Sequence, residues 1–241
     1  MENTRQTTAF IGTMALTAIA CSSYAGINSH AMHPYHALAI LALAAATSRM
    51  KVKLPALDGN MSVNLPFLLA AVMNLSTVEA ALITSLSTVV QCWPKRGVKL
   101  NTEQMVFNVS TLTLASSVAA SCFHTGGLGS SGGSLAIASA AGILFLGQTI
   151  PVAAIITISQ NLKNGMAPTW WNLARTSFPY FALSAGMTSM MQTVDNRLGW
   201  GAALAIFPVM FGIHHSYREY FAPAVEQVRT APLTRAARAG A

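Results

Sequence analysis

The sequence predicts an all-α fold, a polytopic transmembrane helical bundle of about eight hydrophobic segments. Charged residues make up only 9% of the 241 residues, whereas soluble domains carry about 25%. Apolar residues make up 53% and gather in long runs, and about 17 to 25 such residues are needed to cross a bilayer as a helix. This composition excludes a disordered chain, a disulfide scaffold and a nucleic-acid-binding domain.

Eight apolar runs define the expected helices, and Ala, Ser, Thr and Gly are frequent in them. Such small residues let helix backbones approach closely in a membrane. Only residues 74–77 separate the third run from the fourth, so these two either cross as separate helices or form a re-entrant hairpin. The runs cover residues 8–24, 36–50, 61–75, 78–93, 103–123, 134–161, 178–193 and 199–217.

The positions of the basic residues predict the orientation of the runs. If the N-terminus is inside and the runs alternate, every lysine and arginine except Arg197 falls on the inner side, and Asp195 lies close to Arg197 in the sequence. Cytoplasmic loops carry such an excess of Lys and Arg. The net charge of +7 is therefore a topology signal. We expect a transmembrane domain over residues 1–221, a polar tail or linker over 222–241, and both termini in the cytoplasm.

Aromatic residues mark the expected membrane surfaces. Trp93 closes the fourth run and Trp200 opens the eighth, which is typical of the aromatic belts at membrane–water interfaces. Residues 166–177 predict a short amphipathic helix on the inner surface, with Trp170 and Trp171 as anchors.

Polar residues within the apolar runs are the candidate ligand-binding residues, because they are costly in lipid and normally face the interior of a bundle. Some have a second interpretation. Glu79 stands at the start of a run, where its charge favours a helix N-terminus. Asn108 and Gln148 lie deeper, where hydrogen bonding between helices is the alternative. The candidate residues are Asn64, Asn74, Glu79, Asn108 and Gln148.

Catalytic chemistry has no clear basis in the sequence. No nucleophile with a base, no pair of carboxylates and no cluster with metal-ligand spacing can be assembled from its motifs. We therefore expect a protein that is not an enzyme and that carries no metal or cofactor.

Short motifs between about Arg49 and Tyr220 resemble the bacterial multi-helix membrane input modules of the MASE type, which precede HD-GYP phosphodiesterase, diguanylate cyclase or histidine-kinase outputs. One departure is Ser76-Thr77, where the family has a small Gly-Pro turn. The motifs are Lys51-Val-Lys-Leu-Pro55, Ser62-Val-Asn-Leu-Pro-Phe67, Glu79-Ala-Ala-Leu-Ile83, Phe107-Asn108, Pro179-Tyr-Phe-Ala-Leu-Ser-Ala-Gly186 and Ser216-Tyr-Arg-Glu-Tyr220.

The resemblance implies an integral-membrane sensory module in the bacterial cytoplasmic (inner) membrane. It would bind a small or lipophilic ligand within the bundle and pass a signal out through Tyr217, Arg218 and Tyr220. Two other functions stay open: the substrate-binding component of a vitamin-type transporter, and a non-catalytic subunit of a larger membrane complex. The expected partners are membrane lipids, a small-molecule ligand and either a protein partner or a second copy of the chain, but not nucleic acid.

Overall fold

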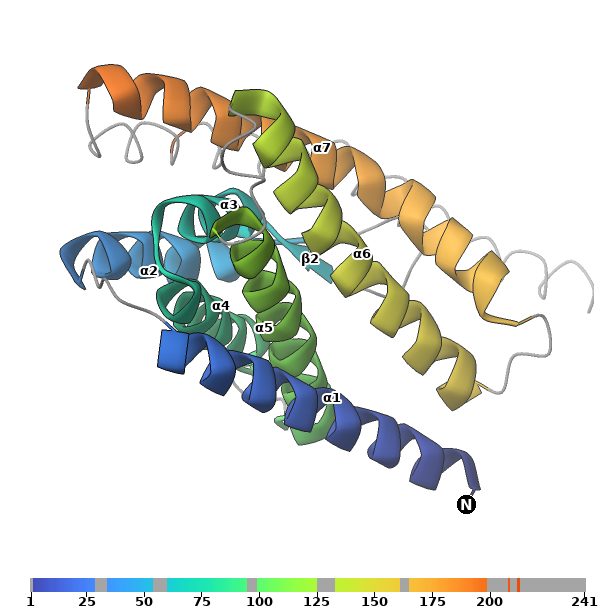
Figure 1. Ribbon diagram of the computed structural model, residues 1–241. Coiled ribbons are helices and arrows are strands. Elements are labelled where there is room, and N and C mark those ends of the chain that lie inside the picture. The colour runs from blue at the N-terminus through green and yellow to red at the C-terminus, as the bar shows by residue number, and fades with distance from the viewer. Residues whose placement is uncertain are drawn as a thin grey trace, which may run out of the picture.

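The computed structural model describes residues 2–28, 34–53, 60–94, 99–124, 133–160 and 165–198, together with residues 208 and 212. These residues form a helical protein with one short β-ribbon (Figure 1). The elements are α1 (Glu2–Asn28), α2 (Pro34–Ser48), β1 (Lys51–Lys53), β2 (Asn60–Ser62), α3 (Leu65–Asn74), α4 (Thr77–Cys92), α5 (Thr102–His124), α6 (Gly133–Gln160) and α7 (Met166–Leu198).

The structure confirms that the apolar runs within the described residues are helical over most of their length. Three helical stretches are long and apolar enough to cross a membrane: Arg5–Ile27, Thr102–His124 and Gly133–Gln160. The predicted run over 199–217 and the predicted tail over 222–241 lie outside the described residues, apart from residues 208 and 212. The number of eight segments therefore stays a prediction.

The third run does not begin as a helix at residue 61. Residues 60–62 form strand β2, which pairs antiparallel with β1 in a register that places Lys51 opposite Ser62. Helix α3 begins only at Leu65, with Pro66 in its first turn. Proline is favoured there because its fixed φ suits a helix start and its missing N–H would have had no partner within the helix.

The two segments predicted over 166–177 and 178–193 are one continuous helix, α7. Proline interrupts helices in general because it lacks an N–H and crowds the preceding turn, yet Pro179 lies inside this helix. Contacts with α6 hold α7 together on both sides of Pro179. Before the proline, Trp170 Nε1 donates to Thr149 Oγ1 at 3.1 Å; after it, Phe181 packs edge-on against Phe145, with ring centroids 5.2 Å apart. Figure 1 shows α6 and α7 lying side by side.

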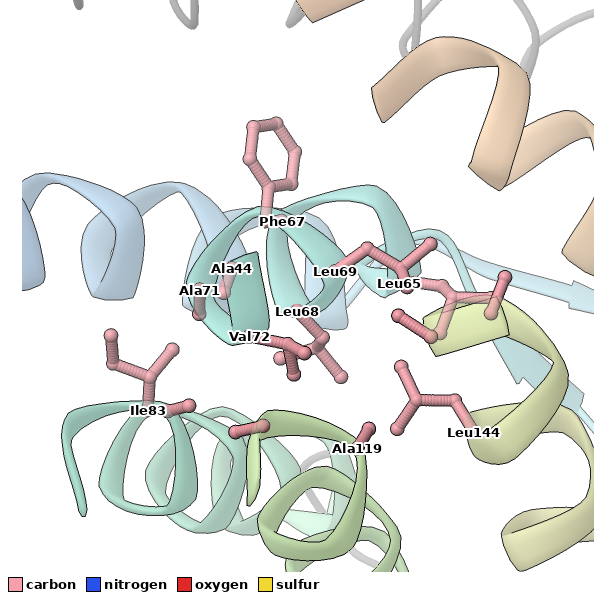
Figure 2. Close-up of a cluster of buried hydrophobic side chains, with 14 of the residues drawn as sticks. Ala44, Leu65, Phe67, Leu68, Leu69, Ala71, Val72, Ile83, Ala119 and Leu144 are labelled. Atoms are coloured by element: carbon pink, nitrogen blue, oxygen red, sulfur yellow. The ribbon is translucent and has the colours of Figure 1, made fainter. Parts of the chain in front are cut away.

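Helix α3 lies in the centre of the bundle, where α2, α4, α5, α6 and α7 surround it (Figure 1). Every residue of α3 except Asn74 is buried. In Figure 2, Leu68 and Val72 point toward Ile83 of α4 and Ala119 of α5, while Phe67 points to the opposite side. Ten residues of helix span about 15 Å, half of the roughly 30 Å of a bilayer core. This length favours the re-entrant interpretation of the third and fourth runs.

The buried N-terminus of α3 has a partner for each backbone N–H of its first turn. Leu65 N–H donates to the Tyr180 hydroxyl at 3.4 Å, and Pro66 has no N–H to satisfy. The N–H groups of Phe67 and Leu68 donate to Asn64 O at 3.0 and 3.2 Å. Because buried N–H groups are costly when unpaired, these bonds allow a helix to begin inside the protein.

The corner between α3 and α4 is fixed by side chains. Ser76 and Glu79 form a capping box, in which Ser76 N–H donates to Glu79 Oε2 at 3.0 Å and Glu79 N–H donates to Ser76 Oγ at 3.4 Å. On the α3 side, His124 Nε2 lies 2.9 Å from Leu75 O and donates to it. The C-terminal end of α5 and the capping box therefore both stabilise the turn between α3 and α4.

Candidate ligand-binding groove

A half-open groove of about 560 Å³ lies between α1, α4 and α5. This volume is within the roughly 300–1,000 Å³ of small-molecule sites, which are mostly apolar with a few polar groups. The α1 wall consists of Ala15, Ala18, Ile19, Ser22 and Ser23; the α4 wall of Val78, Ala81, Leu82, Ser85 and Val89; and the α5 wall of Met105, Val106, Val109, Ser110 and Thr113.

Helical periodicity places these residues on facing surfaces. The α1 residues recur at intervals of three and four, from Ala15 through Ile19 to Ser23, and such residues share one helix face. Small side chains on this face, Ala15 and Ala18, fill little of the space between α1 and the other two helices. The groove therefore results from alanine and serine facing the line where α4 and α5 meet.

Hydroxyl groups supply the polar part of the lining. Ser85 Oγ and Thr113 Oγ1 lie 2.7 Å apart across the α4–α5 interface. Ser110 Oγ donates to Val106 O at 2.7 Å within α5. The Ser22 hydroxyl is buried and has no hydrogen-bond partner among the described residues. None of the lining residues is charged, so the groove suits an uncharged molecule.

The α4–α5 wall is held by further polar contacts along the antiparallel pair. Thr84 Oγ1 donates to Ser116 Oγ at 3.0 Å, and Asn108 Nδ2 donates to Cys92 Sγ at 3.6 Å. Both hydroxyls of the first contact are fully buried. Hydrogen bonds between membrane helices contribute about 0.6 kcal/mol on average, so this series stabilises one side of the groove.

None of the five residues that the sequence analysis proposed for ligand binding lines the groove. Asn64 directly precedes α3 and is buried, whereas Asn74 is the last residue of α3 and is exposed. Glu79 is part of the capping box, and Asn108 joins α5 to α4. Gln148 is half-buried on α6. The structure therefore bears out the capping interpretation of Glu79 and places a hydrogen bond between helices at Asn108, while a ligand role for the five stays a prediction.

The proposed exit residues Tyr217, Arg218 and Tyr220 lie outside the described residues. Within the part of the chain that the structure describes, no three His, Cys, Asp or Glu side chains are grouped closely enough to hold a metal ion.

The described part of the chain is helical, and its three long apolar helices suggest a membrane protein. Comparison with protein-family models, with curated proteins and with solved structures finds no match to the chain. The geometry of the groove and the sequence are therefore the basis of the functional argument.

Proposed function

We propose that this chain is an integral-membrane sensory module that binds a lipophilic small molecule in the groove between α1, α4 and α5. The observation that carries the proposal is the groove itself, a half-open cavity of about 560 Å³ lined by apolar residues and by hydroxyls, with no charged side chain among them. A molecule dissolved in the bilayer would enter it from the side.

The distribution of side chains supports a membrane location. Large apolar side chains are exposed on the outer faces of several helices, including Leu16 of α1, Leu86 of α4 and Leu146 of α6, whereas hydroxyls such as those of Thr84 and Ser116 are fully buried. Lipid would cover the exposed apolar side chains, whereas the buried hydroxyls would not contact lipid. The proposal places the chain in the bacterial inner membrane with eight segments and both termini in the cytoplasm, as the basic residues predict.

Helix α1 is the wall that a ligand would displace. Only 17% of the residues in its most apolar stretch are buried, compared with 56% in α5. Its contacts include one ring pair, Phe10 with Phe107, whose centroids are 6.3 Å apart. A ligand shifts a helix only if it binds one arrangement more tightly than another. Filling the groove favours arrangements in which α1 stands further from α4, and this displacement would reach a partner through the segment that ends at Tyr217, Arg218 and Tyr220.

The apolar lining favours this function over a vitamin-type transport component. That alternative requires a site for a water-soluble molecule, and such molecules are bound through several polar or charged groups. The lining here offers hydroxyls only. A non-catalytic subunit of a larger complex would instead keep a protein partner and leave the groove without a ligand.

Native mass spectrometry of the protein taken from its own membrane in mild detergent tests the proposal. We expect a retained lipophilic molecule, and we expect Val89→Trp, which fills the groove from α4, to lose it. Leu146→Trp on the exposed face of α6 is the matched control and should keep the molecule. A protein partner retained without any small molecule would refute the sensory proposal in favour of the complex subunit.

A further inference from the structure

The hydroxyl hydrogens on the α4 and α5 walls of the groove already form hydrogen bonds within the protein. Ser85 Oγ donates to Ala81 O at 2.7 Å, and Ser110 Oγ donates to Val106 O at 2.7 Å. Each hydroxyl has one hydrogen and two lone pairs. Because the hydrogen of Ser85 is used within α4, the 2.7 Å bond between Ser85 and Thr113 takes its hydrogen from Thr113.

The lone pairs on these walls remain available. Thr113 Oγ1 and Ser110 Oγ have each given away their hydrogen and still have acceptor capacity, and Ser85 Oγ keeps one lone pair after it accepts from Thr113. The lining has no Lys, Arg, His, Trp, Asn or Gln that would turn a donor toward them. These two walls therefore present acceptors and no free donor.

Serines of α1 complete the polar lining. The Ser22 hydroxyl is buried with no partner among the described residues, so an oxygen of a ligand could accept its hydrogen once α1 moves outward and exposes it. A ligand that fits both sides carries a donor for Thr113 and Ser85 and an oxygen that accepts from Ser22. A hydroxyl group is the smallest group that does both.

We propose that the groove, as the site of the proposed function on which this inference rests, selects uncharged lipophiles that carry a hydroxyl or an amide N–H. Ethers and esters without a donor leave the acceptors of Thr113 and Ser85 unmatched. Carboxylates bring a charge that no lining residue neutralises, and burying an unpaired charge is costly. One hydrogen bond corresponds to about a three- to tenfold preference for an alcohol over its methyl ether.

Competitive photolabelling of the whole chain in lipid nanodiscs tests this preference. A diazirine-tagged dodecanol is the probe, and mass spectrometry reads the labelled residues. Unlabelled dodecanol, dodecyl methyl ether and dodecanoate are the competitors. We expect labelling on α1, α4 and α5 at the groove, and about three- to tenfold stronger competition by dodecanol than by the ether, with dodecanoate weakest of the three.

Substitutions test whether the preference for dodecanol over its methyl ether depends on Ser85 and Thr113. The double variant Ser85→Ala, Thr113→Val removes the acceptor pair and leaves the Ser110 acceptor on these walls, so we expect the preference for dodecanol over its ether to fall toward equal competition. Thr157→Val is the matched control, because Thr157 donates to its own helix at Ala153 O in α6 and does not line the groove. This control should keep the wild-type preference.

The outcomes separate the two proposals. Groove labelling with equal competition by dodecanol and the ether on the wild type overturns the donor preference and leaves the proposed function standing. Absence of labelling at the groove overturns both. A preference that stays undiminished in the double variant also overturns this inference, and the wild-type comparison decides the matter on its own if the double variant does not fold.

Discussion

Replacing Gly147 with alanine should force α5 and α6 apart, because the two helices touch at this residue. A Cβ at position 147 would lie 2.7 Å from Ala115 Cβ and 3.3 Å from Ala115 Cα. Carbon atoms in good contact are about 3.5–4.0 Å apart, so the backbones must separate by about 1 Å. Both elements are long helices, and neither offers a flexible side chain at this contact that could move aside.

The expected size of the effect follows from two opposing terms. Overpacking costs about 1–3 kcal/mol, and replacing glycine with alanine inside a helix returns about 1 kcal/mol. We therefore expect Gly147→Ala to lower the free energy of unfolding by about 1 kcal/mol. Gly142→Ala is the matched control on the same helix, since nothing lies within 4 Å of its added Cβ. It should leave stability unchanged or raise it by up to about 1 kcal/mol.

Reversible unfolding in mixed micelles, with the denaturing detergent as the variable, measures both variants. The difference between them isolates the overpacking and should be about 1–3 kcal/mol. Adding Ala115→Gly to Gly147→Ala removes the 2.7 Å contact and should restore part of the loss. Equal stability of Gly147→Ala and Gly142→Ala would show that α5 and α6 do not approach this closely, and would refute the reasoning.

Three further predictions concern polar contacts, each measured by the same unfolding assay. Ser76→Ala should cost about 1 kcal/mol because it removes the capping box, whereas Glu79→Gln keeps a capping residue and should change stability little; the reverse order would contradict the cap. Asn108→Ala should lower stability by about 0.5–1.5 kcal/mol without changing dodecanol competition, and weakened competition would instead support its predicted ligand role. A double-mutant cycle on Thr84→Ala and Ser116→Ala should give a coupling of about 0.6 kcal/mol, and a coupling of zero would show that this bond adds nothing.

The helices could be predicted from the sequence to a large extent, because apolar runs broken by charged stretches mark them directly. The ribbon of β1 and β2 could not, since strands of three residues are too short for an alternating pattern to stand out. The continuity of α7 through Pro179 was also hidden, because local preference opposes a helix there and contacts with α6 override it.

The candidate site was less predictable, for a physical reason. Amides and carboxylates attract attention in an apolar run because they are costly in lipid, yet Glu79 and Asn108 hydrogen-bond to the structure around them. The groove is instead lined by hydroxyls such as Ser85, which satisfies its hydrogen on its own helix. Serine and threonine do this throughout membrane helices, so nothing in the sequence distinguishes Ser22, Ser85 and Thr113 from the others.

The position of α3 also constrains the order in which the chain assembles. With ten residues, this helix is too short to be inserted as a span on its own, and the hydroxyl that pairs with Leu65 N–H lies 115 residues later in the chain. Thr188, which donates to Pro66 O, follows 122 residues later. At about 5–20 residues per second of synthesis, α3 waits about 6–24 s for these partners. We therefore expect that the N-terminal half of this protein reaches its final arrangement only after α7 has been made, so that the last described helix completes the first part of the bundle.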